Sequence, residues 1–431
     1  MKVCVQGLWH LGSVTAACLA SVGHDVAGLD FDKDTVQGLQ LNKLPISEPG
    51  LAELIQEGQE ASRLSFFTLP VEALDGVELL WVAYDTPVND NDEADVDFVV
   101  AQLALALPHL AAGATVLISS QMPVGSISRL ESIAQNLCPT KAIGFAYSPE
   151  NLRLGKALDV FLKPDRIVVG VRTSQDKERI ERLLRPITDR IEWMSVESAE
   201  MTKHAINAFL ATSVVFANEI ASICELVGAD AKEVEKGLKS ESRIGPKAYL
   251  SPGGAFAGGT LARDVEFLQK ISAAKGLAIP LLGAIRLSND EHKNWVRRKL
   301  NAFFPRLSGV SIAVWGLTYK PGTDTLRRSL AVDLCNWLLD RGAVLKVHDP
   351  AVKELPESWN DCVQRVAEPL EALAGTRALV VATEWPQYKQ ISPEQVSGLS
   401  PELVILDANR FVSHFMGIAN VRYVAVGTPT V

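Results

Sequence analysis

Short apolar runs alternate with amphipathic stretches along most of the chain. The first run, Lys2–Gln6, precedes a glycine-containing turn at 7–12, a stretch with helical spacing at 13–22 and a second apolar run at 25–30. A short continuous apolar run is typical of a strand that is buried on both faces of a parallel sheet. This order predicts a strand–turn–helix–strand unit that opens a doubly wound α/β domain.

The same alternation predicts further strands, which we expect to be parallel, at 79–84, 115–119, 142–147, 166–171, 310–317, Val344–His348, 378–382, 403–406 and 422–426. The stretch 199–227 has helical periodicity without Pro or Gly, which predicts one long helix, and 263–298 is also expected to be helical. We therefore expect two Rossmann-like doubly wound domains joined by a long central helix, with boundaries at 1–195, 196–300 and 301–431.

Composition narrows the class of protein. The 431 residues are 47% hydrophobic and 22% charged, which is typical of a globular protein, and the formal net charge is −9. An acidic balance argues against nucleic acid or an anionic membrane as the main partner. No uninterrupted apolar run has membrane-spanning length, and we find no signal peptide. The six scattered cysteines form no CxxC pair, so we expect reduced thiols in the cytoplasm and no metal site.

The first turn has most of a dinucleotide-binding pattern. Gly7 and Gly12 fit the first and third glycines, and Asp30 lies where an acid holds the ribose hydroxyls. A carboxylate at this position favours NAD over NADP, because it repels a 2′-phosphate. Trp9 occupies the place of the middle glycine, so its side chain must turn away or the phosphates must bind differently. The alternative interpretation is a doubly wound domain with a vestigial cofactor site.

A second motif carries a specific resemblance. The segment 253–264 reads GGAFAGGTLARD. It resembles the active-site loop of the UDP-glucose/GDP-mannose dehydrogenase family, the nucleotide-sugar 6-dehydrogenases, which has a glycine-rich run, Cys, two residues, Lys and Asp. Thr260 stands at the Cys position and Arg263 at the Lys position, while Asp264 is retained. The resemblance continues in family order at 85–87, 120–125, 148–152, 199–207, 243–250, 316–329, 383–385 and 407–410, where Asn409 and Arg410 are exchanged relative to the family.

The resemblance implies roles for named residues. It implies a catalytic set of Glu150, Lys203, Asn207, Thr260 and Asp264. It implies cofactor binding by Gly7, Leu11, Gly12, Asp30, Thr86, Ser120 and Arg327. It implies substrate binding by Arg243, Tyr249, Gly258, Tyr319, Lys320 and Arg410, with Arg243 reaching the substrate of a neighbouring subunit. Lys203 and Asn207 are four residues apart and share one helix face, where an amine and an amide suit a developing alkoxide.

The resemblance also implies a reaction. Family members use NAD to oxidise the primary C6 alcohol of a nucleotide sugar such as UDP-glucose or GDP-mannose to an aldehyde, in polysaccharide biosynthesis. The Cys then forms a thiohemiacetal, which a second NAD oxidises on the way to the uronate. A Thr hydroxyl is far less nucleophilic than a thiol, so we expect the reaction to stop at the aldehyde.

Alternatives remain open at this point. The aldehyde hydrate is itself an alcohol that a second NAD can oxidise, or the enzyme can act on a different alcohol. A further alternative is a non-catalytic nucleotide-sugar-binding scaffold. We also expect a homodimer or higher even oligomer, assembled through the long helix at 199–227, because that helix is apolar around much of its surface.

Overall fold

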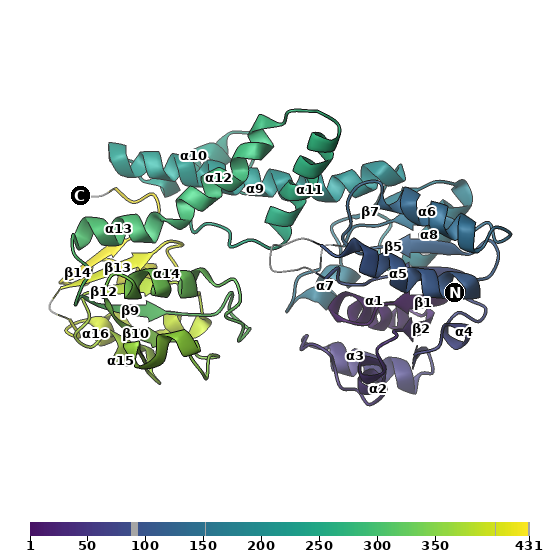
Figure 1. Ribbon diagram of the computed structural model, residues 1–431, viewed down its shortest axis with the longest axis horizontal. Helices are drawn as coiled ribbons and strands as arrows, with labels where there is room; N and C mark the ends of the chain where they lie inside the picture. Colours follow the sequence, from purple (N-terminus) through teal and green to yellow (C-terminus); the bar gives the residue numbers. More distant parts are fainter. Residues whose placement is uncertain (88–93, 151, 401, 430–431) are drawn as a thin grey trace. The chain divides into compact units, whose positions relative to one another are not determined.

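The computed structural model describes residues 1–87, 94–150, 152–400 and 402–429, with the backbone alone at 360 and 361. It divides into two compact units, Met1–Ile206 and Asn207–Val431 (Figure 1). Helix α9 (Val196–Val227) begins in the first unit and ends in the second. Each unit contains one sheet built mainly from parallel strands.

The sheet of the first unit has the strand order β3-β2-β1-β4-β5-β6-β7-β8. All neighbours are parallel except β6 and β7, which are antiparallel. Its strands are β1 (Lys2–Gln6), β2 (Asp25–Leu29), β3 (Leu64–Phe67), β4 (Leu79–Val82), β5 (Thr115–Ile118), β6 (Gly144–Tyr147), β7 (Ile167–Val171) and β8 (Ile191–Met194).

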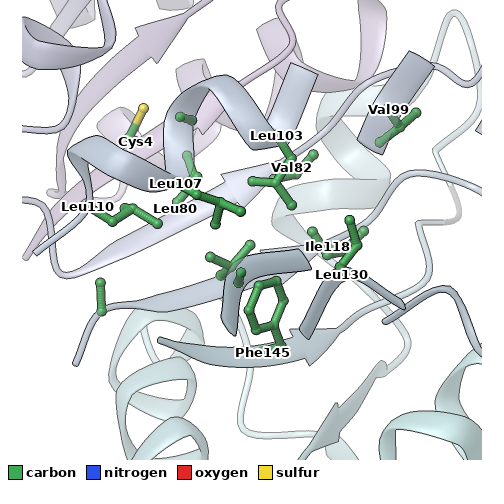
Figure 2. Packing of buried hydrophobic residues seen from close by; sticks show 14 of the residues in the cluster. Cys4, Leu80, Val82, Val99, Leu103, Leu107, Leu110, Ile118, Leu130 and Phe145 are labelled. Carbon is green, nitrogen blue, oxygen red and sulfur yellow. The ribbon is translucent and has the colours of Figure 1, made fainter. Parts of the chain in front are cut away.

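Helices cover both faces of this sheet. They are α1 (His10–Ser21), α2 (Lys33–Gln40), α3 (Leu51–Glu60), α4 (Pro70–Ala73), α5 (Val96–Ala106), η1 (Leu107–His109), α6 (Ser126–Leu137), α7 (Ala157–Leu162) and α8 (Ser174–Leu184). Alternate strand residues enter opposite cores, because successive side chains of a strand point to opposite faces. Val3 and Val5 join a core with α1, α3 and α8, whereas Cys4, Leu80 and Val82 join one with α5 and α6 (Figure 2).

The second unit contains the rest of α9, a group of helices that precedes its sheet in the chain, and a six-stranded parallel sheet of order β11-β10-β9-β12-β13-β14. The helices between α9 and the sheet are α10 (Ala231–Ser240), α11 (Thr260–Ala274), α12 (Pro280–Lys293) and α13 (Trp295–Phe303). The strands are β9 (Ser311–Trp315), β10 (Val344–His348), β11 (Val363–Arg365), β12 (Ala378–Val381), β13 (Leu403–Asp407) and β14 (Val421–Val424). The sheet is covered by α14 (Leu330–Leu339), α15 (Pro369–Leu373), α16 (Pro393–Val396) and the 3₁₀ turns η2 (Glu357–Cys362), η3 (Pro386–Gln390) and η4 (Ser413–Phe415).

The expected fold class is confirmed, with three local corrections. Strand β7 was expected to be parallel but runs antiparallel to β6. The expectation was wrong because an apolar run predicts burial and carries no information on strand direction. Helix α1 begins at His10 and not at 13, since the N–H of Ser13 already donates to the carbonyl of Trp9 at 3.0 Å. The short strands β3, β8 and β11 lie outside the predicted set. The three-domain boundaries stay a prediction.

Helix α9 bears on the expectation that no segment of the chain has membrane-spanning length. Within the described residues it is the one helix long and apolar enough to cross a membrane, and 39% of its apolar window is buried inside the chain. Core helices of globular proteins meet the same criterion, so this finding is weak evidence for a membrane span. The sequence predicts no span here, because single polar residues interrupt the apolar stretch.

Candidate active site

Two glycines of the first turn are required by close packing. Gly7 has φ +90°, and a Cβ there would lie 2.7 Å from the ring of Tyr84. A Cβ on Gly12 would lie 1.6 Å from the carbonyl oxygen of Gly7. Only glycine allows α1 to approach β1 this closely, which is the role of the first and third glycines of a dinucleotide-binding turn.

Trp9 fits the middle position of this turn without backbone strain. It is the N-cap of α1 with φ −72°, where an L-residue is allowed, and its side chain is 50% exposed. The side chain of Leu11, by contrast, is buried in the core against the sheet. Leu11 can therefore offer a ligand only its backbone N–H, in the first turn of α1, where N–H groups and the helix dipole favour a phosphate.

Asp30 follows β2 and faces the same turn. Its Oδ2 accepts the N–H of Leu8 at 2.7 Å and its Oδ1 accepts the N–H of Asp32 at 3.0 Å. A carboxylate has about four lone-pair sites, so capacity remains for ribose hydroxyls. The turn, the start of α1 and Asp30 thus fit NAD, which supplies a hydride acceptor when it is bound.

Two further cofactor candidates follow the next strands of the sheet. Thr86, after β4, donates its hydroxyl to the carbonyl of Gln121, after β5, at 2.7 Å. Ser120 is buried, and its Oγ has no hydrogen-bond partner within the described residues. A buried polar atom without a partner is unusual. It suits a position that meets a ligand at the carboxyl ends of parallel strands.

Glu150 and Lys203 lie together in the first unit. The buried Nζ of Lys203 donates to the backbone carbonyl of Glu150 at 2.7 Å and lies 4.0 Å from its Oε1. The Glu150 carboxylate accepts the N–H of Leu152 at 2.8 Å, and its side chain is 28% exposed. Asn151, part of the motif at 148–152, lies outside the described residues. An ammonium and an accessible carboxylate therefore stand side by side.

Asn207 and Asp264 form a second pair, in the second unit. Asp264 is fully buried and accepts a hydrogen bond from the amide of Asn207. Thr260, the first residue of α11, is exposed and precedes Asp264 by one helical turn. Gly258 and Gly259 before it have positive φ (+140° and +70°). A Cβ on Gly259 would lie 3.2 Å from the hydroxyl of Tyr319, so Tyr319 also lies against this loop.

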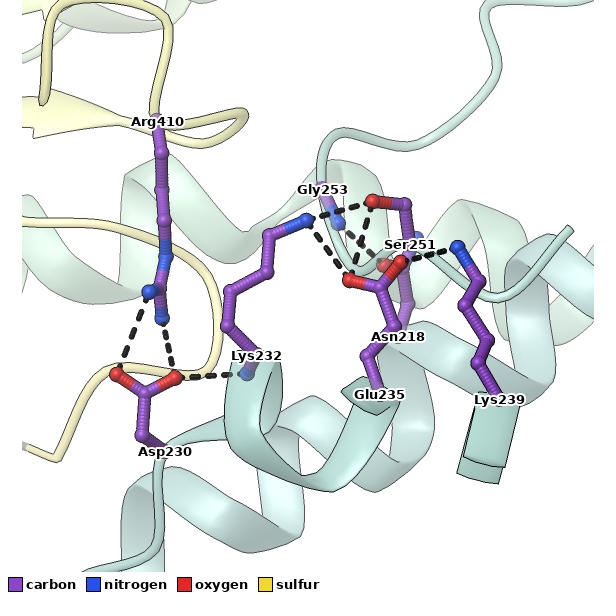
Figure 3. Close-up of polar contacts among 8 residues, drawn as sticks. All are labelled: Asn218, Asp230, Lys232, Glu235, Lys239, Ser251, Gly253 and Arg410. Carbon is purple, nitrogen blue, oxygen red and sulfur yellow. Dashed lines mark hydrogen bonds and ion pairs between the residues drawn. The ribbon is translucent and has the colours of Figure 1, made fainter. Parts of the chain in front are cut away.

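The loop at 253–259 is held by side chains that the sequence does not reveal. Asn218 accepts the N–H of Gly253 at 2.9 Å (Figure 3), Asn409 accepts the N–H of Gly254 at 2.7 Å, and Asn289 makes two bonds to the backbone of Phe256. His292 donates to the carbonyl of Gly253 at 2.8 Å. Burial lowers the pKa of His292, which keeps the ring neutral.

The predicted substrate ligands differ in their surroundings. Arg410 has φ +57° and makes a two-pronged ion pair with Asp230 at 2.9 and 3.3 Å (Figure 3). A phosphate would have to compete with that carboxylate. Arg243 is exposed and pairs with Glu241 at 3.0 Å. Tyr249, Lys320 and Arg327 are exposed. The substrate-binding roles of Arg243, Tyr249, Gly258, Tyr319, Lys320 and Arg410 stay predictions.

Family models match along the chain. The NAD binding domain of the UDP-glucose/GDP-mannose dehydrogenase family matches residues 1–188, its central domain matches 197–291 and its UDP binding domain matches 313–414. The UDP-glucose 6-dehydrogenase of Pseudomonas aeruginosa is 32% identical, over 100% of this chain and 98% of that protein. UDP-glucose 6-dehydrogenase TuaD of Bacillus subtilis is also 32% identical, over 100% and 94%.

A solved structure agrees with these matches. The UDP-glucose dehydrogenase of Pyrobaculum islandicum superimposes with a TM-score of 0.87 at 28% identity, and the match covers 99% of this chain and 98% of that one. Together with the match of the NAD binding domain, these relatives make the protein an NAD-dependent dehydrogenase. The chain belongs to the UDP-glucose/GDP-mannose dehydrogenase family.

Proposed function

We propose that the protein oxidises the C6 alcohol of a nucleotide sugar, with UDP-glucose as the first candidate and GDP-mannose as the second, and stops at the aldehyde. The match to a UDP binding domain and the names of the relatives support the choice of nucleotide. The observation that carries the proposal is the buried Asn207–Asp264 pair, kept one helical turn from a residue that is not cysteine.

The first oxidation needs a base and a group that stabilises negative charge. Bound NAD would supply the acceptor for the hydride from C6, and a carboxylate of the site would take the hydroxyl proton as the C=O bond forms. Asp264 and Glu150 are the candidate bases, and the Lys203 ammonium and the Asn207 amide favour the developing alkoxide. None of these roles requires the cysteine.

The second oxidation is where Thr260 matters. A thiolate adds readily to an aldehyde, but a Thr hydroxyl stays protonated near neutral pH and needs an adjacent base. The segment 253–264 contains no His that could serve as this base. We therefore expect the aldehyde or its hydrate to leave the enzyme.

A panel of UDP- and GDP-sugars tests this proposal. Purified protein and excess NAD should yield about one NADH per sugar, measured by absorbance, with the aldehyde or hydrate identified by mass. Two NADH per sugar and a uronate product would refute the one-step reaction. Thr260→Cys should raise uronate formation, while the matched variant Thr260→Ser, which keeps a hydroxyl, should not.

A non-catalytic nucleotide-sugar-binding scaffold is the second candidate. Trp9 in the cofactor turn and Thr260 in the active loop favour it, because both depart from the family pattern. Calorimetry with the same UDP-sugars separates the two functions. Tight sugar binding without NADH formation from any sugar would support the scaffold and exclude the dehydrogenase proposal.

We also propose a homodimer assembled through α9, in the cytoplasm and with a role in polysaccharide biosynthesis. The exposed apolar residues Phe209, Phe216 and Ile223 recur every seven positions, and Leu226 extends the stripe. Seven-residue spacing is the pattern by which a helix packs along a second copy of itself. Light scattering should show a dimer, and Phe216→Glu should shift it toward monomer; a wild-type monomer at micromolar concentration would exclude this assembly.

A further inference from the structure

A buried carboxylate joins the cofactor turn to the segment after Glu150, all within the first unit. Glu48 lies between α2 and α3 and is 4% exposed. Its Oε2 lies 2.9 Å from Nε2 of His10, the first residue of α1. The backbone N–H groups of Gly155 and Ala157, at the start of α7, donate to its two oxygens at 2.8 and 2.9 Å.

These contacts make Glu48 hard to replace. Burial alone would raise the pKa of Glu48, but the hydrogen bonds from Gly155, Ala157 and His10 together outweigh it and lower the pKa. The carboxylate is therefore ionised at neutral pH. A buried ionised group is stable only when its oxygens are bonded, so the three segments are held in register by one side chain.

One end of this link lies at the cofactor turn, and the other lies in the segment that follows Glu150. His10 directly follows Trp9 in the cofactor turn, and its backbone belongs to the first turn of α1. On the other side, Lys203 bonds the Glu150 carbonyl at 2.7 Å, and Glu48 holds the backbone of Gly155 and Ala157. Glu150 is the only acidic residue in the sequence from 150 to 157.

We propose that Glu48 is a positioning residue through which NAD, bound at the turn, orders the Glu150 segment. The inference rests on the proposed role of Glu150. A phosphate held by the first turn of α1 restrains His10, and the His10–Glu48 bond passes that restraint to Gly155 and Ala157. The segment is then ordered before the sugar arrives, so NAD and the nucleotide sugar bind with positive coupling, which is reciprocal by thermodynamic necessity.

Hydrogen exchange measures this link without any turnover. NAD should slow amide exchange in the wild type both at 7–12 and at 152–157, the latter by about fivefold or more. Glu48→Gln keeps the size of the side chain but loses one acceptor oxygen and the charge. It should keep the NAD-induced protection at 7–12 and lose it at 152–157. Glu53→Gln, an exposed carboxylate on the adjacent α3, is the matched control and should behave like the wild type.

A second variant guards against misfolding of the first. His10→Phe leaves Glu48 its two backbone donors but cuts the link to α1, so it should give the same loss at 152–157. The double variant should lose no more than either single variant, because both act through one bond. The nucleotide-sugar affinity, measured with and without NAD, should lose its NAD dependence in all three variants.

The outcomes separate this proposal from the proposed function. Protection at 152–157 that persists in both single variants, or that is absent in the wild type while 7–12 is protected, overturns the link. No protection at 7–12 overturns both the link and the assignment of the turn to NAD. A wild type that shows the coupled protection but oxidises no sugar sustains the link and contradicts only the proposed reaction.

Discussion

The two sheets of this protein start with the same turn and use it differently. In the first, Gly7 has φ +90°, its N–H donates to the carbonyl of Leu29, and the next residue, Leu8, donates to Asp30. In the second, Gly316 has φ +87°, its N–H donates to the carbonyl of His348, and Leu317 donates to Asp349. Both sheets also share the strand order around these turns.

The two turns differ in the number of hydrogen bonds that the carboxylate accepts from the protein. Asp30 accepts two backbone N–H groups. Asp349 is 4% exposed and accepts six donors. Those donors are the backbone N–H groups of Leu317, Thr318, Ala351 and Val352, the hydroxyl of Thr318 and the indole of Trp385. An acid at the end of the second strand therefore makes a ribose site only if the chain leaves its lone pairs unused.

The largest effect should come from removing the carboxylate of Asp349, which accepts six hydrogen bonds. Asp349→Ala leaves several buried donors without a partner, so we expect the free energy of unfolding to fall by about 3–5 kcal/mol. Urea denaturation measures this change. Asp30→Ala is the matched control and should cost about 1 kcal/mol or less, because it removes the acceptor of two backbone N–H groups, one of which makes an exposed bond. Equal losses in both variants would show that the two acids play the same structural role.

The second effect concerns the cofactor. Asp30→Ala should weaken NAD binding by about 10- to 100-fold, since it removes charge-assisted bonds to the ribose. Calorimetric titration of NAD and NADP measures it, and the wild type should prefer NAD. A wild type that binds NADP more tightly would contradict the assignment of Asp30.

The third effect uses the residue before each acid, His348 in one turn and Leu29 in the other. Burial lowers the pKa of His348 below its ordinary value of 6.5. The unfolded chain therefore binds a proton more readily than the folded chain, and stability is lost as the pH falls below about 6.5. His348→Leu should remove up to about 1.4 kcal/mol per pH unit of this dependence. Unfolding at about pH 7.5 and 5.5 checks it; an unchanged dependence would exclude His348 as a source.

The smallest effect should come from making the first turn resemble the second. Trp9 corresponds in position to Thr318, whose N–H and hydroxyl both bond Asp349. Trp9→Thr should place a hydroxyl near Asp30, raise stability by about 0.5 kcal/mol and weaken NAD binding by less than about tenfold. Trp9→Ser offers the same hydroxyl as a check. Tighter NAD binding in both variants would instead mean that the indole obstructs the cofactor.

The sequence predicted both sheets and the ends of their central strands, because burial on both faces leaves short continuous apolar runs such as the one at β1. It missed β3, β8 and β11, which are short strands of three or four residues, all of them at sheet edges. It also predicted that β7 is parallel to its neighbours, whereas β7 pairs antiparallel with β6.

Some residues of the candidate site could be predicted from the sequence and others could not. Gly7, Gly12 and Asp30 were predictable because their spacing is local. The Glu48 link was not, since its partners lie 38 and more than 100 positions away. Nor was the support of the loop at 253–259 by Asn218, Asn289, His292 and Asn409, because an isolated Asn in a sequence carries no information on which distant backbone it bonds.

The sulfur content of the chain adds a consequence for chemical durability. Five of the six cysteines are buried and only Cys362 is exposed, while burial raises the pKa of Cys18 and Cys335 to about 12. Peroxide and alkylating reagents attack thiolates, so they find little to modify beyond Cys362. With Thr260 in the loop, oxidative stress that converts a catalytic cysteine to a sulfinic acid has no target there, and the enzyme should keep its activity in cells whose thiol enzymes are inactivated.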